Sequence, residues 1–222
     1  MFHIFNSKKQ IIMKYLFFVL LVTGIIACQD SSEPKANDTK TEVLAEANSE
    51  EIINQEFWNR LSKLKGKAFQ GKVLEAPEGD DFREKNLVMH VLDVEENKIY
   101  IPFNVGENRS RTWILSKTKS GIQLKHDHRK EDGSEDEVTM YGGVTPNSGS
   151  DDLAMFPADQ ETVDLLPGTA TNLWWITVDD EQFTYNLRRI GSPIKFSIGF
   201  DLESPIDLPK RSWGWENYKI EK

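Results

Sequence analysis

From residue 67 to about residue 200 the sequence is dominated by short runs in which apolar and polar side chains alternate. β-branched and aromatic residues fill these runs, and turn-forming residues separate them. This is the pattern of β-strands that bury one face. It predicts strands at about 67–74, 86–94, 98–103, 111–117, 121–128, 136–142, 173–179, 182–190 and 194–200.

Very short connections join several of the predicted strands. Examples are Glu95-Glu96-Asn97, Lys119-Ser120-Gly121, Asp179-Asp180-Glu181 and Gly191-Ser192-Pro193. Strands linked this tightly pair antiparallel, because a parallel pair needs a long crossover connection. About nine antiparallel strands in a meander hide their edges most simply by closing into an up-and-down barrel. A two-sheet β-sandwich is the alternative.

One segment before the strands has the period of a helix instead. Its apolar positions are Ile53, Phe57, Leu61 and Leu64. Asn48 or Ser49 is the expected N-cap, and Gly66 follows the end. This pattern predicts an amphipathic helix over 49–65.

Residues 143–172 interrupt the meander. They are expected to form a long loop with a short helix between Ala158 and Leu166. A loop of this length in a compact domain is usually functional or mobile. The aromatic residues that follow Pro209 are expected to pack against the barrel or across its mouth.

The first 27 residues have the composition of an export signal. Three lysines and no acidic residue accompany an apolar run from Tyr15 to Ile26, and a run of about twelve residues is too short to span a bilayer stably. The run ends in Ile25-Ile26-Ala27-Cys28, which resembles the lipobox of bacterial lipoproteins. The resemblance implies that a signal peptide, residues 1–27, is cleaved and that Cys28 carries lipid.

Cys28 is the only cysteine, so the domain has no intramolecular disulfide and no other thiol. Residues 28–48 are polar and predict a disordered acidic tether, which leaves 49–222 as the folded domain. Gln29-Asp30 lacks the aspartate that directly follows the cysteine in lipoproteins retained at the inner membrane of enteric bacteria. We therefore expect a lipid-anchored protein of the cell envelope, at the outer membrane, on its periplasmic face or at the cell surface.

The chain is acidic. It carries a formal charge of −9, and removal of the three lysines before Cys28 makes the mature charge more negative still. Such a charge disfavours nucleic acid as a partner.

The order of elements resembles the calycin group, which comprises the lipocalins and their relatives. A helix containing Phe57-Trp58 precedes Gly66, a first strand and a meander. The lipocalin signature of glycine, one residue and tryptophan is absent, because Phe69 follows Gly66 and Lys67-Ala68. Segments such as Ser110-Arg111-Thr112-Trp113 are similar to secreted bacterial proteins without an assigned activity. The resemblance implies a barrel and assigns no binding residue.

Two histidines continue an apolar strand face. Ile122, Leu124, His126 and His128 share one parity and point to one side. A hairpin loop at Ser120-Gly121 places Trp113 opposite His128, whereas a loop at Lys119-Ser120 places Trp113 opposite His126 and Arg111 opposite His128. Both loops place Arg111, Trp113, His126 and His128 on one face. A three-residue loop would instead place Thr112 and Ile114 on the face of the two histidines, in place of Arg111 and Trp113.

Several roles fit these residues. Histidines two apart on a strand emerge about 7 Å apart and can ligate one metal such as zinc, with His90 as a third ligand. Alternatively they are hydrogen-bonded interior residues, or they contact a bound molecule, haem included. Arg189 shares its parity with Phe183, Tyr185 and Leu187, so it either binds an anion or an aromatic ring or closes one barrel end.

No phosphate loop, His-Glu-x-x-His, Gly-x-Ser-x-Gly or dinucleotide motif is present, which makes catalysis the less favoured reading. The sequence thus predicts a lipid-anchored envelope protein that binds a small or apolar molecule inside a β-barrel. Its alternatives are a hydrolase or isomerase that uses the histidines or a bound metal, and a surface assembly or adhesion component without a pocket.

Overall fold

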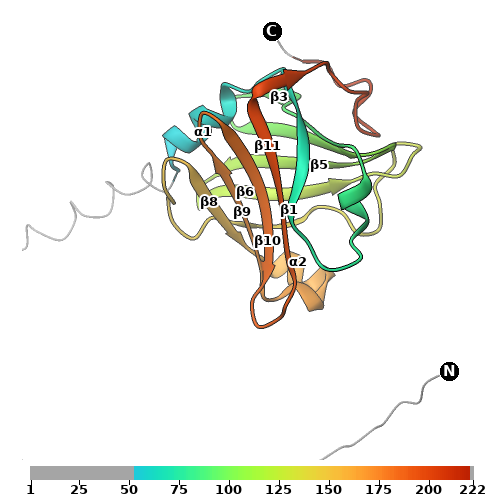
Figure 1. Cartoon of the computed structure of the whole chain (residues 1–222). Helices are drawn as coiled ribbons and strands as arrows, with labels where there is room; N and C mark the ends of the chain where they lie inside the picture. Colours follow the sequence, from blue (N-terminus) through green and yellow to red (C-terminus); the bar gives the residue numbers. More distant parts are fainter. Residues whose placement is uncertain (1–52, 221–222) are drawn as a thin grey trace, which may run out of the picture. The chain divides into compact units, whose positions relative to one another are not determined.

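The computed structural model describes residues 53–220, and this part of the chain is mainly β (Figure 1). The strands are β1 (Ala68–Glu75), β2 (Leu87–His90), β3 (Asp93–Val94), β4 (Lys98–Val105), β5 (Asn108–Thr118), β6 (Gly121–His128), β7 (Tyr141–Val144), β8 (Leu153–Pro157), β9 (Asn172–Val178), β10 (Gln182–Arg189) and β11 (Lys195–Ile206). The helical elements are α1 (Gln55–Ser62), α2 (Gln160–Leu165) and the short 3₁₀ helices η1 (Asp81–Glu84) and η2 (Pro167–Thr169). The predicted signal peptide, Cys28 and the tether lie outside the described residues.

The strands follow one another around the sheet in sequence order. The path is β7-β6-β5-β4-β2-β1-β11-β10-β9-β8, with β3 beside β4. Every pair is antiparallel, and β1 pairs with β11, so that the first and last strands meet. The predicted antiparallel meander is confirmed, and its ten strands along this path nearly close into a barrel, where the sequence predicted about nine.

The barrel has one seam, between β7 and β8. A single bridge joins Gly143 to Ala158 there, and the Asp159 N–H donates to the Gly142 carbonyl over 3.0 Å. The Thr162 hydroxyl accepts from the Gly142 N–H over 2.6 Å and donates to its carbonyl over 2.9 Å. The two strands approach too closely for side chains, because a Cβ at Gly143 would collide with the Pro157 carbonyl.

Residues 143–172 are therefore not simply a long loop. They contain β8 and the two helices α2 and η2. The short strand was missed because acidic turn residues precede it and Pro157 ends it, both of which suggest a loop. The short helix expected in this segment corresponds to α2, which begins after its N-cap Asp159.

Helix α1 covers one end of the barrel (Figure 1). It begins at Gln55, because the Asn54 side chain caps it by accepting the Phe57 N–H over 3.0 Å. The part of the predicted helix before residue 53 lies outside the described residues. The apolar face of α1 buries Phe57, Trp58 and Leu61 in the core. Within residues 53–220, no helix has the length and hydropathy needed to cross a membrane.

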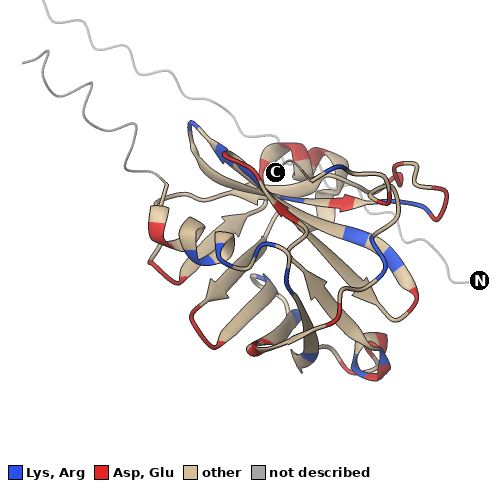
Figure 2. Cartoon of the chain, turned by 90° about the horizontal axis from the view of Figure 1, so that it is seen from above, with Lys and Arg blue, Asp and Glu red and all other residues tan. Residues whose placement is uncertain are grey.

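The barrel interior is apolar at the α1 end. Alternate residues of the strands point inward and are almost fully buried, including Phe69, Met89, Ile101, Leu124, Ile176, Phe183 and Phe200. Most acidic residues lie in the connections between strands (Figure 2). The opposite end, which η1 partly covers, holds the polar residues that the next section describes.

The segment after β11 packs on the outer wall of the barrel, which is the first of the two placements expected for it. The Trp213 N–H donates to the Arg109 carbonyl over 3.0 Å, and Trp215 Nε1 donates to Asp127 Oδ2 over 2.8 Å. The Tyr218 hydroxyl donates to Asp93 Oδ2 over 2.9 Å.

This segment and α2 change the surroundings of the outward-facing residues of β6, which alternation alone would place in solvent. Asp127 is fully buried and also accepts from Arg129 Nε over 2.8 Å. Lys125 is 5% exposed, and its Nζ pairs with Asp159 at 3.0 Å and Glu161 at 2.6 Å. Because α2 and the C-terminal segment cover these positions, both residues are buried although they face away from the barrel interior.

Candidate functional site

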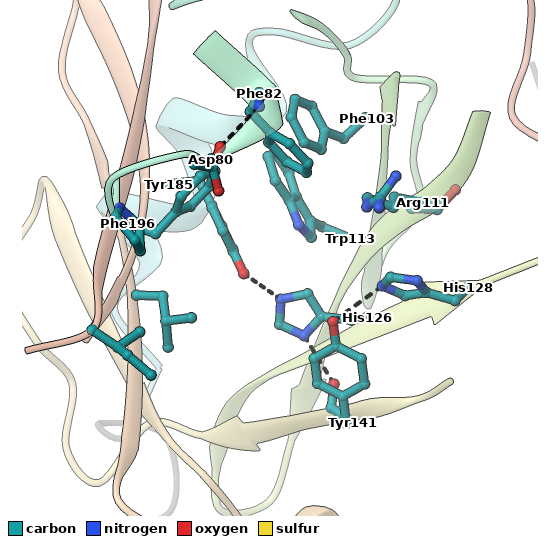
Figure 3. Close-up of a pocket in the computed structure, with 14 residues that line it drawn as sticks. Asp80, Phe82, Phe103, Arg111, Trp113, His126, His128, Tyr141, Tyr185 and Phe196 are labelled. Carbon is teal, nitrogen blue, oxygen red and sulfur yellow. Dashed lines mark hydrogen bonds between the residues drawn. The ribbon is translucent and has the colours of Figure 1, made fainter. Parts of the chain in front are cut away.

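The barrel contains a cavity of about 290 Å³ at the end opposite α1 (Figure 3). Its apolar wall consists of Pro77, Phe82, Phe103, Trp113, Leu187, Ile194 and Phe196. The polar lining consists of Asp80, Arg111, Thr112, His126, His128, Tyr141 and Tyr185. A concave apolar site with a few convergent polar groups is the usual form of a small-molecule site, and this volume lies at the small end of the usual range.

The β5–β6 hairpin brings four of the predicted residues together. Its loop is centred on Lys119-Ser120, so that Arg111 pairs with His128 and Trp113 with His126. This is the second of the two registers that the sequence left open. Because the strand period is two, the register places all four side chains on the inner face.

His126 has both ring nitrogens in hydrogen bonds. Nδ1 lies 2.9 Å from the Tyr141 carbonyl and must donate to it, since a carbonyl only accepts. Nε2 is then the acceptor, and the Tyr185 hydroxyl donates to it over 2.7 Å. Burial lowers the pKa of His126 to about 3. The ring is therefore neutral at pH 7 and held in one tautomer.

His128 lies nearer the open end. Its Nε2 is 3.1 Å from the Tyr141 hydroxyl. Burial, followed by the charge of Arg111, lowers its pKa to about 4. Both histidines therefore act as neutral hydrogen-bonding groups at neutral pH, whereas a general base works best with a pKa near the working pH.

Stacked rings form one side of the cavity. Trp113 lies between Phe103, at a centroid distance of 4.8 Å, and Tyr185, at 4.3 Å. Phe82 of η1 meets Phe196 of β11 edge to face at 5.3 Å. Rings packed on several sides cannot move independently, so the wall is preformed and rigid.

Among residues 53–220, Arg111 is the only lysine or arginine that lines the cavity. Its Nη1 donates to Asn108 Oδ1 over 3.1 Å and to Ser110 Oγ over 3.3 Å. Its guanidinium carbon lies 5.4 Å from the centre of the Phe82 ring, a cation–π distance. Burial lowers the pKa of Arg111, although an arginine remains charged at any physiological pH.

Two predicted site residues lie elsewhere. Arg189 does not line the cavity, and its Nε donates to Asn172 Oδ1 over 2.9 Å, which is a structural role at the strand end. His90 is buried near Arg211 of the C-terminal segment, and its Nδ1 has no hydrogen-bond partner in the described chain. The inward residues of β2 are Leu87 and Met89, so strand parity places His90 on the outer face.

The metal hypothesis loses its third ligand as a result. In the described part of the chain, no three His, Cys, Asp or Glu side chains are grouped so that they could hold a metal ion. Coordination of zinc or haem iron by His126 would require one of its two hydrogen bonds to break.

Sequence reasoning missed Tyr141, Phe82 and Phe103, and it did not assign Tyr185 to the site. The parity shared by Phe183, Tyr185 and Leu187 was visible, but nothing local indicated that β10 faces β6 across the interior. Phe82 was hidden in a connection, where it enters the site only because η1 folds over the barrel end.

No model of a protein family matches this chain, and comparisons with curated proteins and with solved structures gave no significant match.

Proposed function

We propose that this protein binds one small, largely apolar molecule in the cavity of its barrel. The observation that carries the proposal is an apolar, ring-lined cavity of about 290 Å³ into which Arg111, His126, His128, Tyr141 and Tyr185 converge. Apolar walls supply most of the affinity, and the few polar groups orient the molecule. A surface component without a pocket would not need this arrangement.

We further propose that the domain works in the cell envelope, tethered to the outer membrane through lipid on Cys28. The support is in the sequence, where an export signal ends at the only cysteine and a polar segment separates it from the domain. Lipid on Cys28 would keep the domain at the membrane.

The binding proposal is tested with the neutral fluorophore N-phenyl-1-naphthylamine and the purified full chain. We expect saturable fluorescence enhancement with one site per chain. Leu187 lines the cavity, so Leu187→Trp should fill it and reduce binding at least about tenfold. Leu74→Trp is the matched control, because Leu74 is 44% exposed and does not line the cavity.

Thermal unfolding of both variants shows whether they remain folded. Binding by a folded Leu187→Trp variant that equals binding by the unchanged chain would overturn the proposed site. Lipid on Cys28 is checked separately, by mass spectrometry of the chain isolated from bacterial membranes. The Cys28→Ser variant is the control, and it should be lost from the membrane fraction. If the exported protein carried an unmodified Cys28, the proposal of a lipid anchor would be contradicted.

A further inference from the structure

We propose that the molecule bound in this cavity is a compact apolar carboxylic acid and that its carboxylate pairs with the guanidinium of Arg111. This inference rests on the proposed function and adds the charge and size of the ligand to it. Three observations carry it: the unused donors of Arg111, the neutrality of the groups around it, and the volume of the cavity.

Arg111 has donors to spare. Only Nη1 is hydrogen-bonded, to the neutral oxygens of Asn108 and Ser110, so Nη2 and Nε have no acceptor among residues 53–220. No carboxylate in the same residues lies within 4.0 Å of its guanidinium. A partly buried charge without a counter-ion is costly, whereas a carboxylate would bind it through two parallel hydrogen bonds.

The groups beside Arg111 do not supply the missing negative charge. His128 and His126 are neutral at pH 7, because burial lowers both of their pKa values. Burial raises the pKa of Tyr141 to about 12 and that of Tyr185 well above 10. Both tyrosines are therefore neutral, and their hydroxyls are further hydrogen-bonding groups on the polar side of the cavity.

In the part of the chain that the structure describes, Asp80 is the only acidic residue of the lining, and its carboxylate has another role. Its Oδ1 accepts the Phe82 N–H over 2.8 Å and so caps η1. In Figure 3 it lies on the η1 side of the cavity, beyond Phe82, while Arg111 projects from β5 beside His128. The positive and negative charges of the lining are thus separated, and an anion can reach Arg111 without displacing Asp80.

The volume limits the size of the acid. A cavity of about 290 Å³ lies at the small end of the range for small-molecule sites. A molecule of two or three aromatic rings is of this size, and the aromatic wall of Phe103, Trp113 and Phe82 offers matching surfaces. A long acyl chain would have to leave most of its length outside.

The test compares two probes of nearly equal shape, naphthalene-2-carboxylate and the neutral naphthalene-2-carboxamide. Each competes with N-phenyl-1-naphthylamine for the full chain at pH 7. We expect the carboxylate to bind at least about tenfold more tightly than the amide, because a hydrogen bond to a charged group is stronger than a neutral one. This comparison needs no variant and so does not depend on the folding of one.

Variants then locate the charge. Arg111→Gln should weaken the carboxylate at least about tenfold and leave the amide within about twofold, while Arg111→Lys should retain part of the preference. The matched control is Arg188→Gln, which removes the same charge from an exposed position on β10 and should change neither affinity.

Equal affinities for the carboxylate and the amide, or loss of both in Arg111→Gln, would overturn the carboxylate inference. If N-phenyl-1-naphthylamine still bound in a way that depended on Leu187, the proposed function would stand. If neither the fluorophore nor the two naphthalene probes bound the cavity, both proposals would fall together.

Discussion

The hydroxyl of Tyr185 donates a hydrogen bond to Nε2 of His126 across the barrel interior, over 2.7 Å. The two residues come from β10 and β6, which do not neighbour each other in the sheet, since β7, β8 and β9 lie between them on the side of the seam and five strands on the other side. This bond joins the opposite sides of the barrel and holds the histidine in the tautomer that donates to Tyr141. It also sets the polar side of the cavity before any ligand binds.

Tyr185→Phe should lower the free energy of unfolding by about 1–3 kcal/mol, because it leaves a buried imidazole nitrogen without a donor. Urea unfolding at pH 7 measures the change. Tyr141→Phe is the comparison, since its hydroxyl meets the more exposed His128, and it should cost less. An equal or smaller loss for Tyr185→Phe would mean that the bond across the barrel contributes little.

Acidification should destabilise the protein through its buried histidines. The pKa values of His90 and His128 are about 4 and that of His126 is about 3, all below the ordinary 6.5. The unfolded chain therefore binds more protons than the folded chain between about pH 4 and 6.5. The free energy of unfolding is therefore not reduced by these histidines above pH 6.5. Below that pH it falls by up to about 1.4 kcal/mol per pH unit for each histidine.

Urea unfolding between pH 7 and pH 5 checks this slope, because most carboxylates titrate below that range. Tyr141 and Tyr185, which contact His126, have raised pKa values and do not titrate there. His126→Gln should reduce the slope by the contribution of one proton. A slope that the substitution leaves unchanged would show that His126 is protonated in the folded chain or does not titrate on unfolding.

Gly143→Ala should destabilise the barrel at its seam. A Cβ at this position would collide with the Pro157 carbonyl, and β7 could not keep its bridge to Ala158. We expect a loss of about 1–3 kcal/mol, as for other overpacked sites, measured as a lower urea midpoint. Gly168→Ala is the control, because a Cβ there has no atom within 4 Å. Similar midpoints for the two variants would indicate that the seam can open without cost.

Trp215→Phe should loosen the C-terminal segment from the outer wall. The substitution removes the indole donor to Asp127, which is fully buried, while keeping an aromatic ring against Tyr100. The expected loss is about 1.5–3 kcal/mol, the range for hydrogen bonds to charged groups. Among residues 53–220 the Trp213 indole N–H has no side-chain acceptor, and the centre of its ring lies 5.9 Å from the Arg109 guanidinium carbon. Trp213→Phe keeps a ring there and should cost less than about 1 kcal/mol. Protease cleavage of the segment provides a second measurement, and equal protection in both variants would contradict the prediction.

Local alternation was sufficient to predict most of the strands and the composition of the interior face. The inner side of β6 was identified by its alternating pattern, in which Ile122, Leu124, His126 and His128 share one parity. The short turn between β5 and β6 limited this pair to a few registers. From these two facts the sequence alone placed Arg111, Trp113 and both histidines on one face.

The sequence could not determine which outward positions would be covered. Asp127, Lys125 and His90 all have the parity of surface residues, yet each is buried because another segment lies over it. Whether a segment covers an outward-facing residue depends on contacts between residues far apart in the chain. The local alternation of apolar and polar residues does not report the free energy of such contacts. The short strand β8 was missed for the same reason, since its pairing with β9 outweighs its weak local pattern.

The sequence by itself determined an antiparallel β meander, the inner faces of its strands and the residues of one hairpin that point into the interior. Only the tertiary structure decided that β1 meets β11, that Tyr185 crosses the interior to His126 and that η1 places Phe82 beside Arg111. The physical reason is that side-chain direction follows from the two-residue period of a strand, whereas closure of the barrel depends on the summed energy of distant strand pairs and packed side chains.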